Sequence, residues 1–250
     1  MILGTPQPGK VDEIKARCGP FLVEQAYING EFISTGETFP VEDPSCDLPI
    51  ANVTVCDAAL TEKAIQHAKT AFKTWSKKTP KERGALVAKW GQLMMKNQEQ
   101  VGAVITAENG KPYGEGKGEV GYSASFCDWA SHECRRVHGE TMSSPWADRR
   151  IVNIKQPIGV AGMIAPWNFP AAMIARKVAP AIAVGCTVVI KPPSLTPISA
   201  LALCKLAHEA GIPAGVINCL PTNKANSSAV GRAICESEDV AALSFTGDLQ

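Results

Sequence analysis

The last third of the sequence alternates between strand-like and helix-like patterns, and this alternation limits the possible folds more than any other feature. The strand patterns occupy residues 159–165, 186–190, 216–220 and 242–245, and amphipathic helical patterns fill 171–184, 198–210 and 229–236 between them. Consecutive strand-helix-strand units build parallel sheets through right-handed crossovers. The sequence therefore predicts an α/β fold with a doubly wound parallel sheet.

The first half of the chain is predicted to be mostly helical. Apolar residues recur at helical spacing over 57–75, 86–94 and from 101 to Asn109-Gly110, and another helix is expected over 119–138 after a glycine-rich segment. Asp57 is the expected N-cap of the first helix. Residues 27–32 (YINGEF) predict a hairpin that turns at Asn29-Gly30, whereas Pro40 to Pro44 predicts a loop.

Composition limits the classes of partner and of site. The chain carries 25 basic and 24 acidic residues, which favours a small metabolite over nucleic acid, and no apolar stretch reaches the roughly 20 residues of a membrane helix. Nine scattered cysteines indicate a reducing compartment, so the cytoplasm is expected and a mitochondrial location stays open. Cys127, His132, Cys134 and His138 lack the paired spacing of a zinc site, so no metal site is expected.

Ligands of an open parallel sheet bind beyond the carboxyl ends of its strands, which here precede APWNFP (165–170), KPPSLTP (191–197), PTNKAN (221–226) and TGDLQ (246–250). The side-chain amide of Asn168 either stabilises an oxyanion or caps the helix that follows. Lys191 either contacts a ribose or phosphate, or is a solvated lysine at a strand end. The pair Arg176-Lys177 either reaches the surface or lines a polar pocket.

Several segments in fixed order resemble the NAD(P)-dependent aldehyde dehydrogenase superfamily, and in detail its succinate-semialdehyde dehydrogenases. They are PIGVAGMIAPWNFP, MIARKVAPAIAVGCTVVIKP, ALALCKLAHEAGIPAGVINCLP and LSFTG, with YINGEF and ENGKPYGEGKGEV upstream. The resemblance implies an NAD(P)-binding domain with a five-stranded parallel core, a catalytic domain and an oligomerisation hairpin. It divides the chain into an extension (1–26), a helical part (27–140), an oligomerisation strand and linker (141–158), and an incomplete parallel α/β part (159–250).

The resemblance also assigns roles to individual residues. Asn168 is expected in the oxyanion hole, Lys177 is expected to orient it and relay protons, and Arg176 is expected to pair with the far carboxylate of succinate semialdehyde. Lys191 matches the lysine that holds the adenosine ribose. Ser194 replaces a glutamate that excludes the 2′-phosphate in NAD-preferring members, so we expect both NAD and NADP to be used. The other residues expected at the cofactor are Pro166, Trp167, Thr246 and Gly247.

The activity that the resemblance implies is oxidation of succinate semialdehyde to succinate in 4-aminobutyrate breakdown, by a homo-oligomer. The family's nucleophilic cysteine and its glutamate lie beyond the FTG segment, so the chain by itself is expected to be inactive. Asp248 is expected to repel the cofactor pyrophosphate. A non-catalytic product that associates with full-length subunits, and a broad-specificity aldehyde dehydrogenase, are the alternatives.

Overall fold

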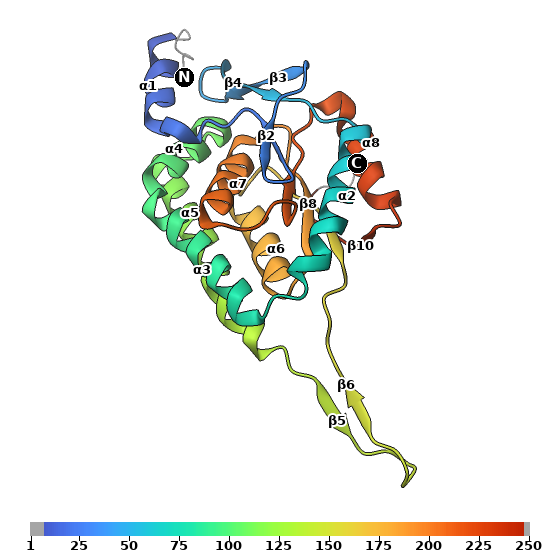
Figure 1. Ribbon diagram of the computed structural model, residues 1–250. Coiled ribbons are helices and arrows are strands. Elements are labelled where there is room, and N and C mark those ends of the chain that lie inside the picture. Colours follow the sequence, from blue (N-terminus) through green and yellow to red (C-terminus); the bar gives the residue numbers. More distant parts are fainter. Residues whose placement is uncertain (1–7, 248–250) are drawn as a thin grey trace.

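The structure, a computed structural model, describes residues 8–247 and contains a six-stranded mixed sheet in the order β10-β7-β8-β9-β1-β2 (Figure 1). The first four of these strands are parallel, which confirms the predicted parallel part of the sheet. Their bounds are β7 Val160–Ile164, β8 Thr187–Lys191, β9 Ile217–Cys219 and β10 Val240–Phe245. The described residues thus supply four parallel strands where the resemblance implied five.

The YINGEF hairpin joins the same sheet, which the sequence did not predict. β1 (Ala26–Ile28) and β2 (Glu31–Ile33) pair antiparallel around Asn29 and Gly30, and both turn residues have positive φ as the sequence predicted. β1 also pairs antiparallel with β9. The parallel sheet is therefore extended at one end by a hairpin and has β10 as its outer strand at the other.

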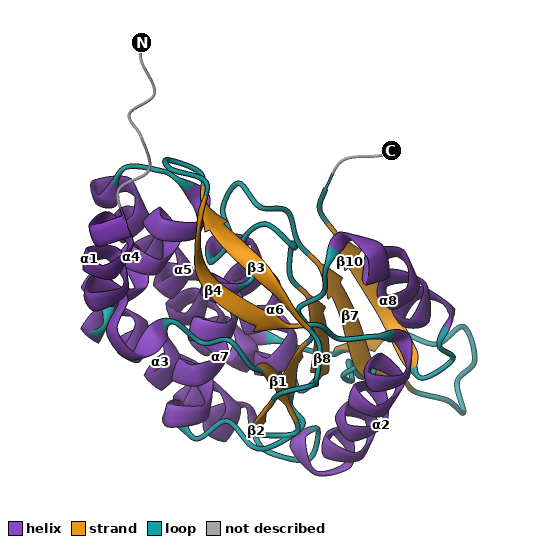
Figure 2. Cartoon of the chain, turned by 90° about the horizontal axis from the view of Figure 1, so that it is seen from above, coloured by secondary structure: helices purple, strands orange, loops and turns teal. Residues whose placement is uncertain are grey.

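Helices cover both faces of the sheet, as expected of a doubly wound fold (Figure 2). α2 (Ala58–Trp75) and α8 (Lys224–Glu236) pack on one face, while α6 (Ala172–Ala183) and α7 (Ile198–Ala210) pack on the other. α3 (Pro80–Lys96), α4 (Gln98–Asn109) and α5 (Tyr113–Glu133) form an outer layer beyond α6 and α7. α1 (Pro8–Cys18), followed by the short 3-10 helix η1 (Gly19–Phe21), packs against α4.

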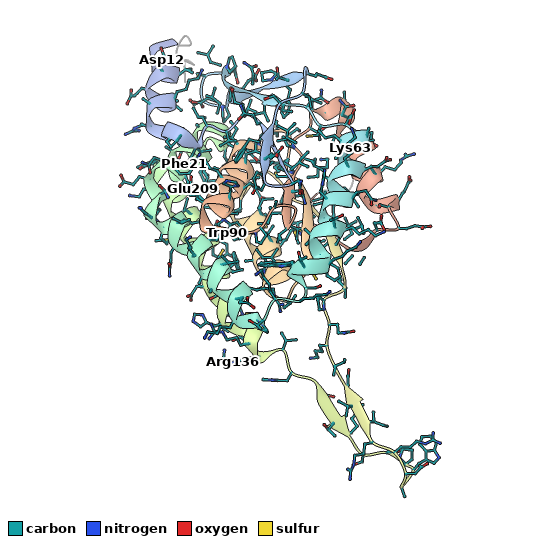
Figure 3. All side chains as sticks on the ribbon, in the orientation of Figure 1. Asp12, Phe21, Lys63, Trp90, Arg136 and Glu209 are labelled. Atoms are coloured by element: carbon teal, nitrogen blue, oxygen red, sulfur yellow. The ribbon has the colours of Figure 1, made fainter. Side chains whose placement is uncertain are left out.

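Capping and buried tryptophans explain why the helices take these positions. Asp57 accepts a hydrogen bond from the Leu60 amide at 2.7 Å, which confirms it as the N-cap of α2. The indole of Trp90, labelled in Figure 3, donates to the Leu203 carbonyl at 2.9 Å and joins α3 to α7. Trp75 joins α2 to α6 in the same way, because its indole donates to the Ile182 carbonyl at 3.0 Å.

Two predictions for the first half were wrong. Pro40 to Asp43 is not a loop, because β3 (Thr38–Asp43) pairs antiparallel with β4 (Leu48–Thr54), and of the predicted loop only Pro44 lies in the turn that joins the two strands. α5 begins at Tyr113, six residues earlier than predicted. Gly116 allows close packing, since a Cβ at this position would lie 2.6 Å from the Gly102 carbonyl oxygen of α4.

The predicted linker strand is one half of a hairpin that projects from the body (Figure 1). β5 (Glu140–Met142) pairs antiparallel with β6 (Ile151–Asn153), and a short 3-10 helix, η2 (Cys134–Arg136), precedes them. We call residues 137–158 the arm. Several of its apolar side chains are exposed, among them Met142, Trp146, Val152, Ile154 and Ile158. No helix in the described part of the chain has the length and apolar character required to cross a membrane.

Candidate functional site

The loops after β7, β8 and β10 meet at one edge of the sheet, which we call the rim. β7 lies between β8 and β10, so the strand order reverses there and the chain has a topological switch point. Ile164, the last residue of β7, is paired with both Lys191 and Phe245. The amide of Thr246 donates to the Ile164 carbonyl at 3.1 Å, and that of Ala165 to the Lys191 carbonyl at 3.4 Å. Three of the four predicted ligand loops are thereby joined.

The Trp167-Asn168-Phe169 segment is held through its backbone. The side-chain amide of Asn109 donates to the Trp167 carbonyl at 2.8 Å, and the Lys111 ammonium donates to the Asn168 carbonyl at 2.9 Å. The same ammonium lies 4.3 Å from the centroid of the Phe169 ring. The three side chains of the segment remain exposed, and the Asn168 amide binds no other described residue. It is therefore free for a ligand.

Glu119 of α5 caps α6, so the interpretation of Asn168 as a helix cap is wrong. α6 begins at Ala172, and the buried Glu119 carboxylate accepts hydrogen bonds from the amides of Ala171 at 2.8 Å and Ala172 at 3.1 Å. Its other oxygen accepts from the Lys111 ammonium. One buried carboxylate thus satisfies the helix N-terminus and also fixes the lysine that holds Asn168.

Glu108 of α4 caps the N-terminus of α7, as Glu119 caps that of α6. Its carboxylate accepts from the amides of Ile198 at 2.7 Å and Ser199 at 2.8 Å, and it is almost completely buried. Burial raises the pKa of Glu108 to about 8, although the hydrogen bonds from Ser199 and Ile198 oppose this shift. Two neighbouring helices that follow rim loops are therefore positioned by carboxylates from the outer layer.

Lys191 is buried, and the interpretation of it as a solvated lysine is wrong. It is the last residue of β8, with 9% of its surface exposed, and its ammonium has no hydrogen bond or ion pair within residues 8–247. Burial lowers the pKa of Lys191 because no nearby carboxylate compensates the charge. A ligand hydroxyl or phosphate is the type of group that would satisfy this ammonium.

Arg176 and Lys177 point to different environments from the same helix. Arg176 is exposed, which confirms the surface interpretation for it, and its guanidinium lies 5.6 Å from the centroid of the Phe126 ring. Lys177 is partly buried and donates to the Ser244 hydroxyl of β10 at 2.8 Å. Burial, and secondarily the Arg176 charge, lowers the pKa of Lys177. The hydrogen bond that the described residues give to the Lys177 ammonium is therefore to Ser244, and its role in orienting Asn168 stays a prediction.

The remaining predicted cofactor residues also lie at the rim. Ser194 and Trp167 line a cavity of about 360 Å³ together with Asn109 and Thr196. Pro166 is partly buried between Ala165 and Trp167, and Thr246 and Gly247 are exposed after β10. Asp248, whose carboxylate was expected to repel a pyrophosphate, lies outside the described residues.

Burial disfavours the reactive thiolate form of five of the cysteines. All nine are free thiols. Burial raises the pKa of five of them, to about 12 for Cys18 and for Cys56, and higher than the usual range for Cys127, Cys134 and Cys219. Within the described residues, no group of three or more histidine, cysteine, aspartate or glutamate side chains is arranged to hold a metal ion.

Sequence reasoning missed the residues that support the rim. No role at the site was predicted for Glu108, Asn109, Lys111 or Glu119, although all four belong to the ENGKPYGEGKGEV segment that carries part of the family resemblance. A signal was available, because an acidic residue on an otherwise apolar helix is costly to bury unless hydrogen bonds compensate it. The partners of Glu119 and Glu108 could not be named from the sequence, since the backbone amides that these carboxylates bind lie more than 50 residues away.

A doubly wound sheet whose switch point carries a free amide and a lysine without a partner in residues 8–247 is typical of dinucleotide-binding α/β domains. The sequence profile of the aldehyde dehydrogenase family matches residues 32–250. The chain belongs to the aldehyde dehydrogenase family, whose members are oxidoreductases.

Individual relatives agree with this assignment. The mitochondrial succinate-semialdehyde dehydrogenase of Homo sapiens is 47% identical over 222 residues, which are 89% of this chain and 42% of the relative. A solved succinate-semialdehyde dehydrogenase from Burkholderia pseudomallei superposes with a TM-score of 0.88 at 44% identity, covering 91% of this chain and 47% of that one. The chain therefore spans less than half the length of these relatives.

A third structure bears on the cofactor. The indole-3-acetaldehyde dehydrogenase AldA of P. syringae, solved in complex with NAD+, superposes with a TM-score of 0.86 at 32% identity, covering 93% of this chain and 48% of that one. Together with the family assignment, this supports a nicotinamide cofactor.

Proposed function

We propose that this chain is the dinucleotide-binding part of an aldehyde dehydrogenase that oxidises succinate semialdehyde to succinate with NAD or NADP, a step of 4-aminobutyrate breakdown. One observation carries the proposal: the free amide of Asn168 and the partnerless ammonium of Lys191 occupy the same switch-point rim. The first offers a neutral donor for an oxyanion and the second a cation for a ribose or phosphate.

The residues of the rim fit a nicotinamide dinucleotide. Lys191 is a buried cation without a partner among the described residues, and a ribose hydroxyl or a phosphate would supply one. The cofactor, when bound, accepts the hydride that leaves the aldehyde carbon. Trp167 and Ser194 offer an aromatic surface and a small neutral side chain in the adjoining cavity.

We assign the stabilisation of the developing oxyanion to Asn168. Its side-chain amide can donate a hydrogen bond without charge, and Asn109 and Lys111 fix the backbone on which it is mounted. Lys177 shares a hydrogen bond with Ser244 and has a lowered pKa, so it can release or take up a proton more readily than an exposed lysine.

The substrate carboxylate is assigned to Arg176. Its guanidinium has no carboxylate partner within residues 8–247 and lies beside an aromatic surface formed by Tyr122 and Phe126, whose ring centroids are 4.6 Å apart. An arginine can bind a carboxylate through two parallel hydrogen bonds, and the apolar surface suits the methylene groups between the carboxylate and the aldehyde.

Replacing Arg176 with leucine is expected to lower kcat/KM for succinate semialdehyde by roughly tenfold to a hundredfold, the value of one charge-assisted interaction. The neutral butyraldehyde should lose less than about threefold. Both substrates are measured by NAD(P)H absorbance in a hybrid enzyme that joins residues 27–247 of this chain to the remaining part of the human relative. Equal losses for the two aldehydes would leave the broad-specificity alternative as the better interpretation.

Replacing Ser194 with glutamate is expected to weaken NADPH binding by about tenfold or more, because a carboxylate at this position repels the 2′-phosphate. NADH binding should stay within about threefold. Fluorescence titration of each nucleotide with the chain measures both constants, and Ser194→Gln, which adds the same bulk without charge, is the matched control. A similar loss of NADPH binding in the glutamine variant would show that bulk, not charge, is responsible.

A non-catalytic role is the second candidate, and the raised pKa values of the buried thiols favour it for the 250-residue chain alone. An assay of NAD(P)H formation separates the non-catalytic role from the enzymatic role when nucleotide binding is measured separately.

We also propose that the arm joins copies of the family protein into a homo-oligomer, because several of its apolar residues are exposed. A cytoplasmic location, with a mitochondrial one open, is proposed from the thiol content alone.

A further inference from the structure

A cavity of about 650 Å³ lies at the root of the arm and is lined by three basic side chains, those of Lys78, Arg83 and Lys155. The end of α2, the start of α3, η2 and the linker between β6 and β7 form its walls. Figure 3 labels Arg136 of η2 beside this root. Its lining residues within the described chain include no acidic side chain. Pro157 and Val184 precede β7 and β8, so the cavity lies at the amino ends of these strands, opposite the rim.

Arg83 is the buried cation of this cavity. Only 6% of its surface is exposed, and no carboxylate in the described part of the chain forms an ion pair with it. Its Nε donates to the Ala183 carbonyl at 2.9 Å and its Nη1 donates to the Lys78 carbonyl, but its Nη2 donates to no described atom. Burial lowers the pKa of Arg83, so its charge is held at a cost that an anion would offset.

Two lysines, Lys78 and Lys155, bring further positive charge to the lining of the cavity. Lys155 is exposed in the part of the arm that follows β6, and its ammonium has no partner within residues 8–247. Lys78 has only a surface pair with Glu82, at 3.8 Å. Free donors from the body and from the arm therefore face one concave space whose volume is in the range of small-molecule sites.

We propose that this cavity binds a phosphate-bearing small metabolite, held by Arg83 on the body and by Lys155 on the linker of the arm. Guanidinium and ammonium groups are the usual protein partners of phosphate oxygens. Because Lys155 belongs to the linker and Arg83 to α3, the bound anion connects the arm to the body. The site is separate from the rim and does not depend on the nucleotide that binds there.

The test is isothermal titration of inorganic pyrophosphate into the 250-residue chain and four variants, with circular dichroism to verify folding. Lys155→Gln and Lys78→Gln remove cavity charges that are exposed enough to be replaced without loss of structure. Lys89→Gln, on the exposed face of α3, matches the change in net charge. Lys191→Gln removes the cation of the rim, so that binding of pyrophosphate at the nucleotide site is recognised.

We expect pyrophosphate to bind the unmodified chain, the Lys89 variant and the Lys191 variant equally. Lys155→Gln should raise the dissociation constant roughly tenfold to a hundredfold, and Lys78→Gln should raise it by a smaller factor. The bound anion should also slow amide hydrogen exchange in residues 154–156. The proposal is overturned if the unmodified chain binds no pyrophosphate, if Lys155→Gln leaves the constant unchanged, or if only Lys191→Gln abolishes binding; this last result would support the nucleotide site alone.

Discussion

Replacing Glu119 with leucine is expected to lower the free energy of unfolding by about 3 to 5 kcal/mol, the cost of removing one partner of a buried ion pair. The loss has two physical sources. The amides of Ala171 and Ala172 at the start of α6 lose their acceptor inside the protein, and the Lys111 ammonium loses its carboxylate. Urea denaturation of the chain followed by circular dichroism measures the difference.

Glu119→Gln is the matched variant for this prediction. Its amide oxygen can still accept a hydrogen bond from Ala171 or Ala172, but its neutral side chain no longer pairs with Lys111. We therefore expect it to lose less than the leucine variant. Lys117→Gln, which removes a partly exposed pair with Glu99, should cost less than about 1 kcal/mol. A leucine variant as stable as the Lys117 variant would contradict the role assigned to Glu119.

The predicted elements that agree with the structure are those whose ends are determined locally. α7 has the predicted bounds, 198–210, because Pro197 precedes it and Gly211 ends it in the left-handed conformation. The Asn29-Gly30 turn and the Asp57 cap were predicted for the same reason. In each case the residue that determines the boundary is next to it in the sequence.

The errors arose where a distant segment decides the conformation. β3 contains a proline, and only its pairing with β4 makes it a strand. The glycine-rich segment 112–118 did not indicate a helix by propensity, but α5 begins within it, and Gly116 is one position where α4 packs too closely for a larger residue. α8 is an exception, because its start is determined locally by Asn223, which accepts from the Asn226 amide at 2.9 Å, and the prediction placed that start five residues too late.

The candidate site also has features that the sequence could predict and features that depend on distant contacts. Strand order placed Asn168, Lys191 and Thr246 at one rim, because the carboxyl ends of parallel strands meet there. The burial of Lys191 and the supporting contacts of Asn109 and Lys111 depend on α4, α5 and the packing around them. Sequence position thus identified the groups that can face a ligand, whereas their electrostatic state required the structure.

Replacing Asn168 with alanine is expected to lower kcat of the hybrid enzyme by roughly a hundredfold to a thousandfold, the usual cost of removing one oxyanion donor. The free energy of unfolding should change by less than about 0.5 kcal/mol, because the side chain is exposed and binds no other described residue. Asn168→Asp keeps the shape but places a negative charge beside the developing oxyanion, so it should be at least as slow.

The pairing of these two measurements separates a chemical role for Asn168 from a structural one. Asn109→Ala removes the hydrogen bond to the Trp167 carbonyl, and it should lower both kcat and stability because the backbone of the segment is then less well fixed. Asn168→Ala should lower kcat alone. If it instead lowers the unfolding free energy while single-turnover rates remain unchanged, the amide supports the loop and the oxyanion must be stabilised by another group at the rim.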